Sequence, residues 1–227
     1  MSETRPPTLS PRPGRGRLVG WSVLVSLLTA LSFWAATVEL ELEPDVFYRW
    51  SSALADAAFY VVLLGLVLLL ARGFPELLAH RPARRSRASL AVAAAIVAGA
   101  FGFDWAYEEL FGPFRLEQGI PTFWDGSRAP QFVANLLVVA GLVPYVEEQL
   151  FRGVGYGLLE RHGRLLAIVV TALAFGAAHG HLGLLPAFAV FGAALGWLRA
   201  WSGSIWPCVA AHGVFNALVT ILSVVLG

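Results

Sequence analysis

Long apolar runs are the feature that most limits what this chain can fold into. Seven of them recur along 227 residues, and most approach the ~20 residues that a helix needs to cross a bilayer core about 30 Å thick. Charged residues make up only 14% of the chain, against about 25% in soluble domains. We therefore predict an all-α, polytopic transmembrane helical bundle of about seven spans. The expected spans are residues 18–38, 52–71, 89–105, 131–160, 164–180, 184–200 and 204–226.

The expected organisation has three parts. Residues 1–17 are rich in Pro and Arg, which predicts a disordered cytoplasmic tail. The apolar run that follows is too long for a signal peptide and has no clear cleavage site, so we expect it to be retained as the first span. Residues 18–129 then hold the N-terminal spans and an outer segment, and residues 130–227 form a four-helix core. The single cysteine, Cys208, excludes an intrachain disulfide and a CxxC metal site.

Arginine is unevenly distributed between the two sides of this expected bundle. All sixteen basic residues are Arg. The predicted inner side carries Arg5, Arg12, Arg15, Arg17, Arg72, Arg81, Arg84, Arg85, Arg87, Arg161, Arg164 and Arg199. The predicted outer side carries Arg49, Arg115 and Arg128, with the acids Glu39, Glu41, Glu43, Asp45, Glu108, Glu109, Glu117 and Asp125. Because basic loops stay in the cytoplasm, we predict a cytoplasmic N-terminus.

The same composition bears on the location of the protein. Tryptophans, Trp21 among them, fall near the ends of the expected spans, which is typical of interfacial anchors. An Ala- and Arg-rich chain without lysine favours a GC-rich bacterial genome. We therefore expect a multi-pass protein of the bacterial cytoplasmic membrane, with the lipid bilayer as its surroundings and no nucleic acid among its partners.

Several polar residues lie inside the expected fourth, fifth and seventh spans, and six of them are candidate site residues. They are Glu147, Glu148, Arg152, His179, His212 and Asn216. Each charge near the centre of a bilayer costs roughly 2.5–3.5 kcal/mol on insertion scales, so such residues usually serve function. Glu148 and Arg152 are four residues apart and can form an ion pair on one helix face.

Four of these residues are expected at a similar depth. With 1.5 Å of rise per residue, Glu147 lies roughly 20 Å and His179 about 22 Å from the turn between spans four and five. By the same count, His212 lies roughly 12 Å and Asn216 roughly 18 Å along the last span. The four can then meet within one bundle, provided that the fourth span continues as helix past the glutamates to about residue 160.

The chemistry of this set favours hydrolysis of an amide without a covalent intermediate. A carboxylate beside a neutral imidazole can hold and deprotonate a water molecule. A second His and an Asn can donate hydrogen bonds to a developing oxyanion. The sequence contains neither a GxSxG nor an HExxH motif. A metal remains an alternative, because Glu147, His179 and His212 would suffice for a catalytic zinc.

Three motifs in this part of the chain resemble those of a known family. EEQLFR at residues 147–152, FGAAH at residues 175–179 and HGVFN at residues 212–216 are similar to the EExxxR, FxxxH and HxxxN motifs of the CPBP family. These are the CAAX-protease and bacteriocin-processing (Abi) intramembrane proteases, which are related to the Rce-type prenyl endopeptidases and include the myxosortases. The motifs cover roughly residues 130–227, and the first three spans carry none.

The resemblance implies a role for each matching position. Glu147 would activate water with His179 as its partner, while His212 and Asn216 would stabilise the oxyanion. The resemblance implies supporting roles for Glu148, Arg152 and Phe175.

The family has been described both as metalloproteases and as glutamate-type proteases without a metal. We prefer no cofactor, because Asn is a poor zinc ligand. In addition, Glu148 points about 100° around the helix from Glu147, and this direction suits Arg152 better than a metal-bound imidazole.

The resemblance also implies the partner. We expect an endopeptidase that cleaves near the C-terminus of a membrane-anchored or lipidated substrate, such as a prenylated peptide, a bacteriocin or a C-terminal sorting tail. Two alternatives come from other classes: a small membrane transporter, and a non-catalytic scaffold that binds a membrane peptide. Gly192 and Gly196 form a GxxxG motif in the sixth span, which predicts close helix packing.

Overall fold

The computed structural model describes residues 13–38, 45–111 and 121–226, and every regular element in these ranges is helical. The predicted all-α bundle is therefore confirmed. The helices are α1 (Arg15–Thr37), α2 (Trp50–Ala71), α3 (Ser86–Phe111), α4 (Ala129–Leu137), α5 (Val143–Glu148), α6 (Tyr156–Leu159), α7 (Arg164–Ala177), α8 (Leu185–Ser202) and α9 (Trp206–Leu226). Short 3₁₀ turns cover Val46–Tyr48, Pro75–Leu78, Gly126–Arg128, Glu160–His162 and Leu182–Leu184. Of the expected features, residues 1–12 of the tail and Glu39, Glu41, Glu43, Arg115 and Glu117 lie outside the described residues.

Six helical segments are long and apolar enough to cross a membrane within the described part of the chain. They are Arg15–Thr37, Trp50–Ala71, Ser86–Leu110, Gly126–His162, Leu182–Ser202 and Trp206–Leu226. The fifth expected span, residues 164–180, corresponds to the shorter helix α7, which has 14 residues. It extends only about 21 Å, less than the bilayer core of about 30 Å.

The turn after α7 nevertheless reaches deep into the bundle. A Cβ atom on Gly180 would lie 2.6 Å from the carbonyl oxygen of Ser32 in α1, and the φ of Gly180 is +74°. Both features require glycine at this position. The next residues contact α3, where the hydroxyl of Tyr107 donates to the carbonyl oxygen of Gly183 at 2.5 Å. The short helix and its turn together thus carry the chain most of the way across the bundle.

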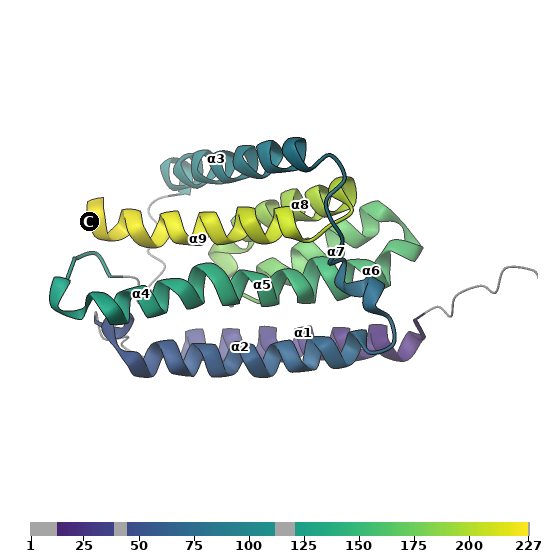
Figure 1. Cartoon of the computed structure of the whole chain (residues 1–227), viewed down its shortest axis with the longest axis horizontal. Coiled ribbons are helices and arrows are strands. Elements are labelled where there is room, and N and C mark those ends of the chain that lie inside the picture. Colours follow the sequence, from purple (N-terminus) through teal and green to yellow (C-terminus); the bar gives the residue numbers. More distant parts are fainter. Residues whose placement is uncertain (1–12, 39–44, 112–120, 227) are drawn as a thin grey trace, which may run out of the picture.

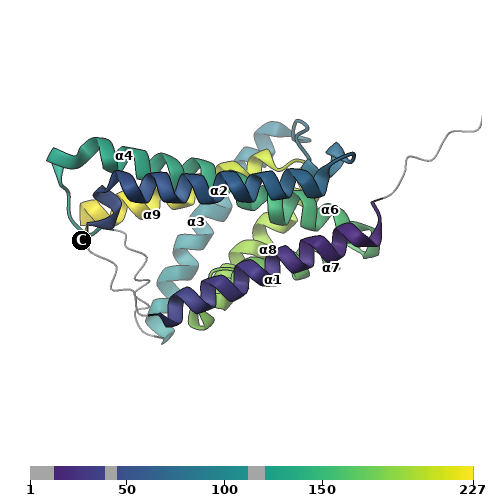
Figure 2. The ribbon, with the colours of Figure 1, turned by 90° about the horizontal axis from the view of Figure 1, so that it is seen from below.

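The arginine-rich loops gather at one end of the bundle. Figure 1 shows the start of α1, the α2–α3 connection and the end of α6 at the right, with the C-terminal end of α9 and the start of α4 at the left. Three arginine side chains donate to backbone oxygens across these loops: Arg17 to Arg72 (2.5 Å), Arg161 to Pro13 (2.9 Å) and Arg81 to Gly203 (2.6 Å). Figure 2 shows that α1 and α2 diverge from this end toward the opposite one.

Residues 129–159 form one composite helix built from α4, α5 and α6 with two π-helical segments, Val138–Leu142 and Gln149–Gly155. The expected fourth span therefore continues through the glutamates to Leu159. The second π segment is joined to α1, because the indole Nε1 of Trp21 donates to the carbonyl oxygen of Leu150 at 2.9 Å. Trp21 is buried at 4% exposure, so the expectation that it is an interfacial anchor is wrong.

Helices α7 and α8 pack closely at the glycines of the GxxxG motif, as predicted. A Cβ atom on Gly192 would lie 3.2 Å from the Cα of Ala172, and one on Gly196 would lie 3.3 Å from Ile168. Arg199 in α8 is buried, and its Nε donates to the carbonyl oxygen of Arg152 at 3.0 Å. Arg199 therefore joins α8 to the composite helix inside the bundle.

A second group of ionic contacts lies at the end of the bundle opposite the arginine-rich loops. Arg128 donates to Asp45 at 2.7 Å and to Asp125 at 2.6 Å, and Arg49 contacts Asp45 at 2.6 Å. The hydroxyl of Tyr48 donates to the carbonyl oxygen of Phe123 at 2.6 Å. This end cluster (Asp45, Arg49, Asp125 and Arg128) joins the start of α2 to the start of α4.

Candidate active site

The composite helix presents a fully buried ion pair to the bundle interior. Arg152 donates to Oε1 of Glu148 at 2.9 Å, and both side chains have 0% exposure. The other arm of the guanidinium donates to the carbonyl oxygen of Gly192 at 2.9 Å, which it can reach because α8 has no side chain there. The guanidinium carbon also lies 4.5 Å from the centre of the Phe175 ring. Arg152 therefore connects three helices: the composite helix, α7 and α8.

The same oxygen of Glu148 also contacts His212 on α9. Nδ1 of His212 lies 3.1 Å from Oε1 of Glu148. Since a carboxylate only accepts, Nδ1 carries the proton of this hydrogen bond. The expectation that Glu148 would serve Arg152 alone is therefore incomplete, because one carboxylate holds both the guanidinium and the imidazole.

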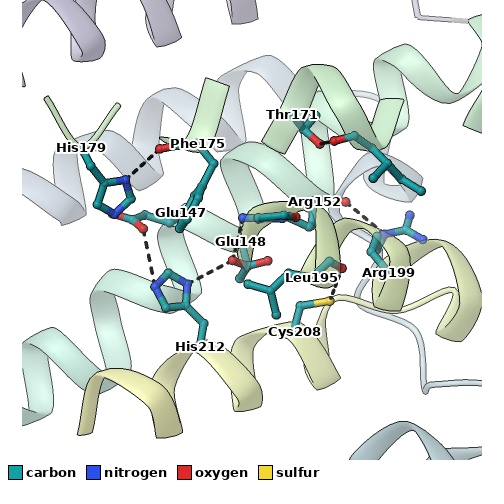
Figure 3. A network of polar contacts seen from close by, with 12 residues as sticks. Glu147, Glu148, Arg152, Thr171, Phe175, His179, Leu195, Arg199, Cys208 and His212 are labelled. Atoms are coloured by element: carbon teal, nitrogen blue, oxygen red, sulfur yellow. Dashed lines mark hydrogen bonds and ion pairs between the residues drawn. The ribbon is translucent and has the colours of Figure 1, made fainter. Parts of the chain in front are cut away.

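Glu147 lies between the two imidazoles. Figure 3 shows its carboxylate between the rings of His179 and His212, and Oε2 lies 3.9 Å from Nε2 of His212. Oε1 accepts a hydrogen bond of 2.9 Å from the hydroxyl of Tyr60 in α2. Among the described residues, no group donates a hydrogen bond to Oε2, although this atom is buried. One carboxylate oxygen is thus held, and the other is left for a further partner.

His179 lies in the turn just beyond the end of α7 at Ala177, not within the helix as expected. Its Nδ1 is 2.8 Å from the carbonyl oxygen of Phe175, which can only accept, so Nδ1 is the protonated nitrogen. The ring stacks on Phe188 of α8, with centroids 3.9 Å apart and planes 19° from parallel. These two contacts fix the ring and leave Nε2 as its remaining polar atom.

Asn216 and the glycine of the HGVFN motif hold α9 against the first π segment. The side-chain amide of Asn216 donates to the carbonyl oxygen of Val139 at 3.0 Å. A Cβ atom on Gly213 would lie 2.5 Å from the carbonyl oxygen of Ala140, so only glycine allows this approach. An amide nitrogen has two hydrogens, so Asn216 keeps one for another acceptor.

These side chains share one cavity of about 650 Å³, formed by α2, α3, α5, α7, α8 and α9. Five expected site residues border it: Glu147, His179, His212 and Asn216, with the supporting Phe175. Glu148 and Arg152 lie behind this wall and are buried. Most of the remaining lining is apolar, while α2 contributes Asp56 and Tyr60.

The sequence motifs did not reveal the two residues of α2. Ala53, Asp56, Tyr60, Leu63 and Val67 follow the three- and four-residue spacing of one helix face, and three of them are buried apolar residues. An ionisable residue on such a face of a span is a functional candidate in its own right. The presence of Asp56 in a span was therefore enough to mark this face of α2 as part of a candidate site.

Comparison with known families gives a match over the C-terminal helices. Residues 129–218 match the family model of the Rce1-like proteins, described as type II CAAX prenyl endopeptidase Rce1-like. Over these residues, the chain is similar to the CAAX protease family. The matched segment runs from α4 into α9 and contains Glu147, His179, His212 and Asn216, whereas α1 to α3 lie outside it. It indicates a CAAX-type endopeptidase that acts on a membrane-anchored substrate within the bilayer. No curated protein and no solved structure matches the chain.

Whether this candidate site fits a metal depends on its donor atoms. The imidazoles of His179 and His212 each donate Nδ1–H to a carbonyl or carboxylate oxygen, as metal-bound imidazoles commonly do. The expectation that Glu148 is badly placed for this role is therefore wrong.

The distances do not complete a metal site, however. Oε2 of Glu147 and Nε2 of His212 are 3.9 Å apart, whereas two ligand atoms on a tetrahedral zinc lie about 3.3 Å apart. Within the described ranges, no group of three or more His, Cys, Asp or Glu side chains is arranged to hold a metal ion. The residues as they stand do not fit the metal.

Proposed function

We propose that the protein is an intramembrane endopeptidase that cleaves a peptide bond near the C-terminus of a membrane-anchored or lipidated polypeptide. Water activated by Glu147 and His179 is the nucleophile, and no metal takes part. The observation that carries this proposal is the carboxylate of Glu147: Tyr60 holds one oxygen, and the other has no donor among the described residues and lies at the cavity.

The proposed chemistry begins with a water molecule between Glu147 and Nε2 of His179. Glu147 takes a proton from this water as its oxygen attacks the scissile carbonyl carbon. A neutral imidazole with its proton on Nδ1 has a lone pair on Nε2, so His179 can accept the second hydrogen of the water. When the tetrahedral intermediate collapses, the proton on Glu147 passes to the leaving nitrogen, and the carboxylate is restored.

His212 and Asn216 are proposed to stabilise the oxyanion of that intermediate. Because Nδ1 of His212 already donates to Glu148, donation from Nε2 requires the protonated imidazolium. Glu148 is the buried counter-ion that such a cation needs. The second amide hydrogen of Asn216 supplies another donor.

This function is tested by comparing the C-termini of membrane proteins by mass spectrometry. The cells to compare produce the wild type, Glu147→Gln or no protein. Shortened C-termini that appear only with the wild type would support the proposal. If cells with Glu147→Gln also contain the shortened C-termini, the proposed role of Glu147 is wrong. If no cells contain them, the proposal that the protein is a protease is wrong.

The absence of a metal from the mechanism has its own test. Purified wild-type protein treated with a strong chelator and dialysed is expected to keep its proteolytic activity. A metal present at one per chain, whose removal and return switch the activity off and on, would show that zinc bound by Glu147, His179 and His212 is required.

We further propose that the arginine-rich end faces the cytoplasm of a bacterium. The grouping of Arg17, Arg72, Arg81 and Arg161 at this end supports that orientation. Among the candidate substrates, the lysine-free composition favours C-terminal sorting tails, because it fits a GC-rich bacterial genome. Myxosortases remove such tails. Alkaline phosphatase fused after Gly227 should then be active and fused after Arg87 inactive, and the reverse pattern would contradict the orientation.

A further inference from the structure

Asp56 is an acidic side chain inside a membrane-spanning helix and has no partner among the residues that the structure describes. It lies on the face of α2 that also carries Tyr60, one turn away, and it borders the same cavity as Glu147. Among the described residues, none forms a hydrogen bond or an ion pair with Asp56. A charge within a span costs roughly 2.5–3.5 kcal/mol on insertion scales, so it calls for a compensating partner.

The described part of the chain supplies no arginine to this part of the cavity. No arginine is among the described residues that line it. The two buried arginines of the core are held elsewhere, Arg152 by Glu148 and the carbonyl oxygen of Gly192, and Arg199 by the carbonyl oxygen of Arg152. The carboxylate of Asp56 is therefore exposed to an otherwise mostly apolar space that a substrate must enter to reach Glu147.

We propose that Asp56 binds a positively charged side chain of the substrate, Lys or Arg, and so selects which peptide bond reaches Glu147. This inference rests on the proposed function and adds the chemical class of the substrate. An elongated cation whose methylene groups pack on the apolar lining while its head group meets the carboxylate suits both properties of the cavity.

The geometry also gives the position of that cation along the substrate. Asp56 precedes Tyr60 by four residues, which is about 6 Å along the helix axis, and the hydroxyl of Tyr60 is 2.9 Å from Glu147. An extended peptide advances about 3.3 Å per residue, so the basic residue is expected about two to four residues from the cleaved bond. It lies toward the end of the bundle that carries the end cluster, because α2 begins at that end.

The test uses the full-length protein in lipid nanodiscs and a positional library of farnesylated and palmitoylated peptides. Each position is occupied in turn by Arg, Lys, Gln or Glu, and the products are identified by mass spectrometry. The wild type is expected to favour Arg or Lys over Gln at one position by about tenfold in kcat/KM, equivalent to one well-formed charged contact. Asp56→Asn should bring this ratio close to one, and Asp56→Arg should reverse it in favour of Glu.

The matched control is Asp125→Asn, which removes an acidic side chain from the end cluster and should keep the wild-type ratio. If Asp56→Asn also kept that ratio, the cation site would be wrong even though the protein is a protease.

A binding measurement decides the case in which no peptide is cleaved. Dodecylguanidinium should raise the melting temperature of the wild type more than dodecanol does, and Asp56→Asn should remove this difference, whereas Asp125→Asn should not. If neither the wild type nor its variants cleave any peptide but the melting temperatures differ in this way, the proposed function is wrong and the cation site is supported. An equal response of the wild type and Asp56→Asn would remove the cation site.

Discussion

Two arginine-centred networks in this protein are built from the same chemical groups in opposite surroundings. Arg152 pairs with Glu148 at 2.9 Å, with both side chains at 0% exposure. Arg128 pairs with Asp45 at 2.7 Å, where the side chains are 32% and 29% exposed. A buried pair loses far more hydration than an exposed one and is weak evidence for added stability, whereas an exposed pair contributes little in either direction.

The difference between them lies in what each network holds. The charged side chains of the end cluster contact one another and the backbone around the starts of α2 and α4. The buried network reaches His212 through Glu148 and the carbonyl oxygen of Gly192 through Arg152. We infer that the buried pair is retained because Glu148 orients His212 in the proposed active site. The exposed pair joins helices at one end of the bundle.

The largest effect is expected from Arg152→Ala. It leaves Glu148 buried with its charge and without its guanidinium, a change that typically costs about 3–5 kcal/mol. We expect most of the protein to misfold or melt at a much lower temperature, and activity to be lost with it. Thermal unfolding of the purified protein measures this.

A paired replacement sharpens that result. Replacing both Glu148 and Arg152 with Leu removes the charge as well as its partner, so the loss of stability should be smaller than for Arg152→Ala alone. Activity should still be absent, because His212 no longer has its acceptor. A paired variant that is less stable than Arg152→Ala would contradict the view that an unpaired charge is the cause.

The next largest effect concerns the proposed oxyanion donors. His212→Ala and Asn216→Ala are each expected to lower kcat by roughly 10²–10³-fold, the usual effect of losing such a donor. Single-turnover cleavage of a cognate peptide measures it. A loss of less than about threefold for both variants would exclude them from transition-state stabilisation.

A smaller effect is expected from Tyr60→Phe, which removes only the hydroxyl that holds Oε1 of Glu147. We expect kcat to fall by about tenfold, the equivalent of one hydrogen bond to a charged group, with an unchanged KM and an unchanged melting temperature. Phe59→Leu, on the neighbouring exposed position of α2, is the control. A fall in melting temperature that accounts for the lost rate would make Tyr60 merely structural.

The smallest effect belongs to the end cluster. The hydroxyl of Ser127 and the guanidinium of Arg128 hold the pKa of Asp125 at about 2, below its ordinary value of 3.8. Ionised Asp125 thus adds stability that is present above about pH 4 and lost as the pH falls toward 2. At neutral pH, Asp125→Asn should change the melting temperature only slightly, and high salt should reduce even this difference. A large fall in melting temperature that does not depend on salt would mean that the exposed network contributes to stability as much as the buried one.

The sequence predicted the bundle from its apolar runs, and it predicted four polar residues of the cavity wall from the helical rise between them. Glu147, His179, His212 and Asn216 occur at depths that bring them together once the composite helix continues past the glutamates. It does so through two π-helical segments, and no residue in EEQLFRG indicates the change from α-helical to π-helical hydrogen bonding. The end of α7 at Ala177 was also missed, since GAAHG contains no proline that would mark it.

Contacts between distant helices were beyond the reach of such counting. The spacing of Glu148 and Arg152 reveals a partner on the same helix, but nothing in it points to His212 on α9. Tyr60 is one aromatic residue in an apolar span, and its role depends on the packing of α2 against the composite helix. Asp56 is the exception, because a carboxylate inside a span is visible in the sequence alone.

The central claim is that two adjacent glutamates do different work, Glu147 in the chemistry and Glu148 in the architecture. Measuring both kcat and the melting temperature of Glu147→Gln in lipid nanodiscs tests it most directly. We predict a protein that inserts and melts like the wild type while kcat falls by roughly 10²–10⁴-fold, the usual contribution of a general base. Near-normal turnover by Glu147→Gln, or a loss of activity explained by unfolding, would contradict the claim.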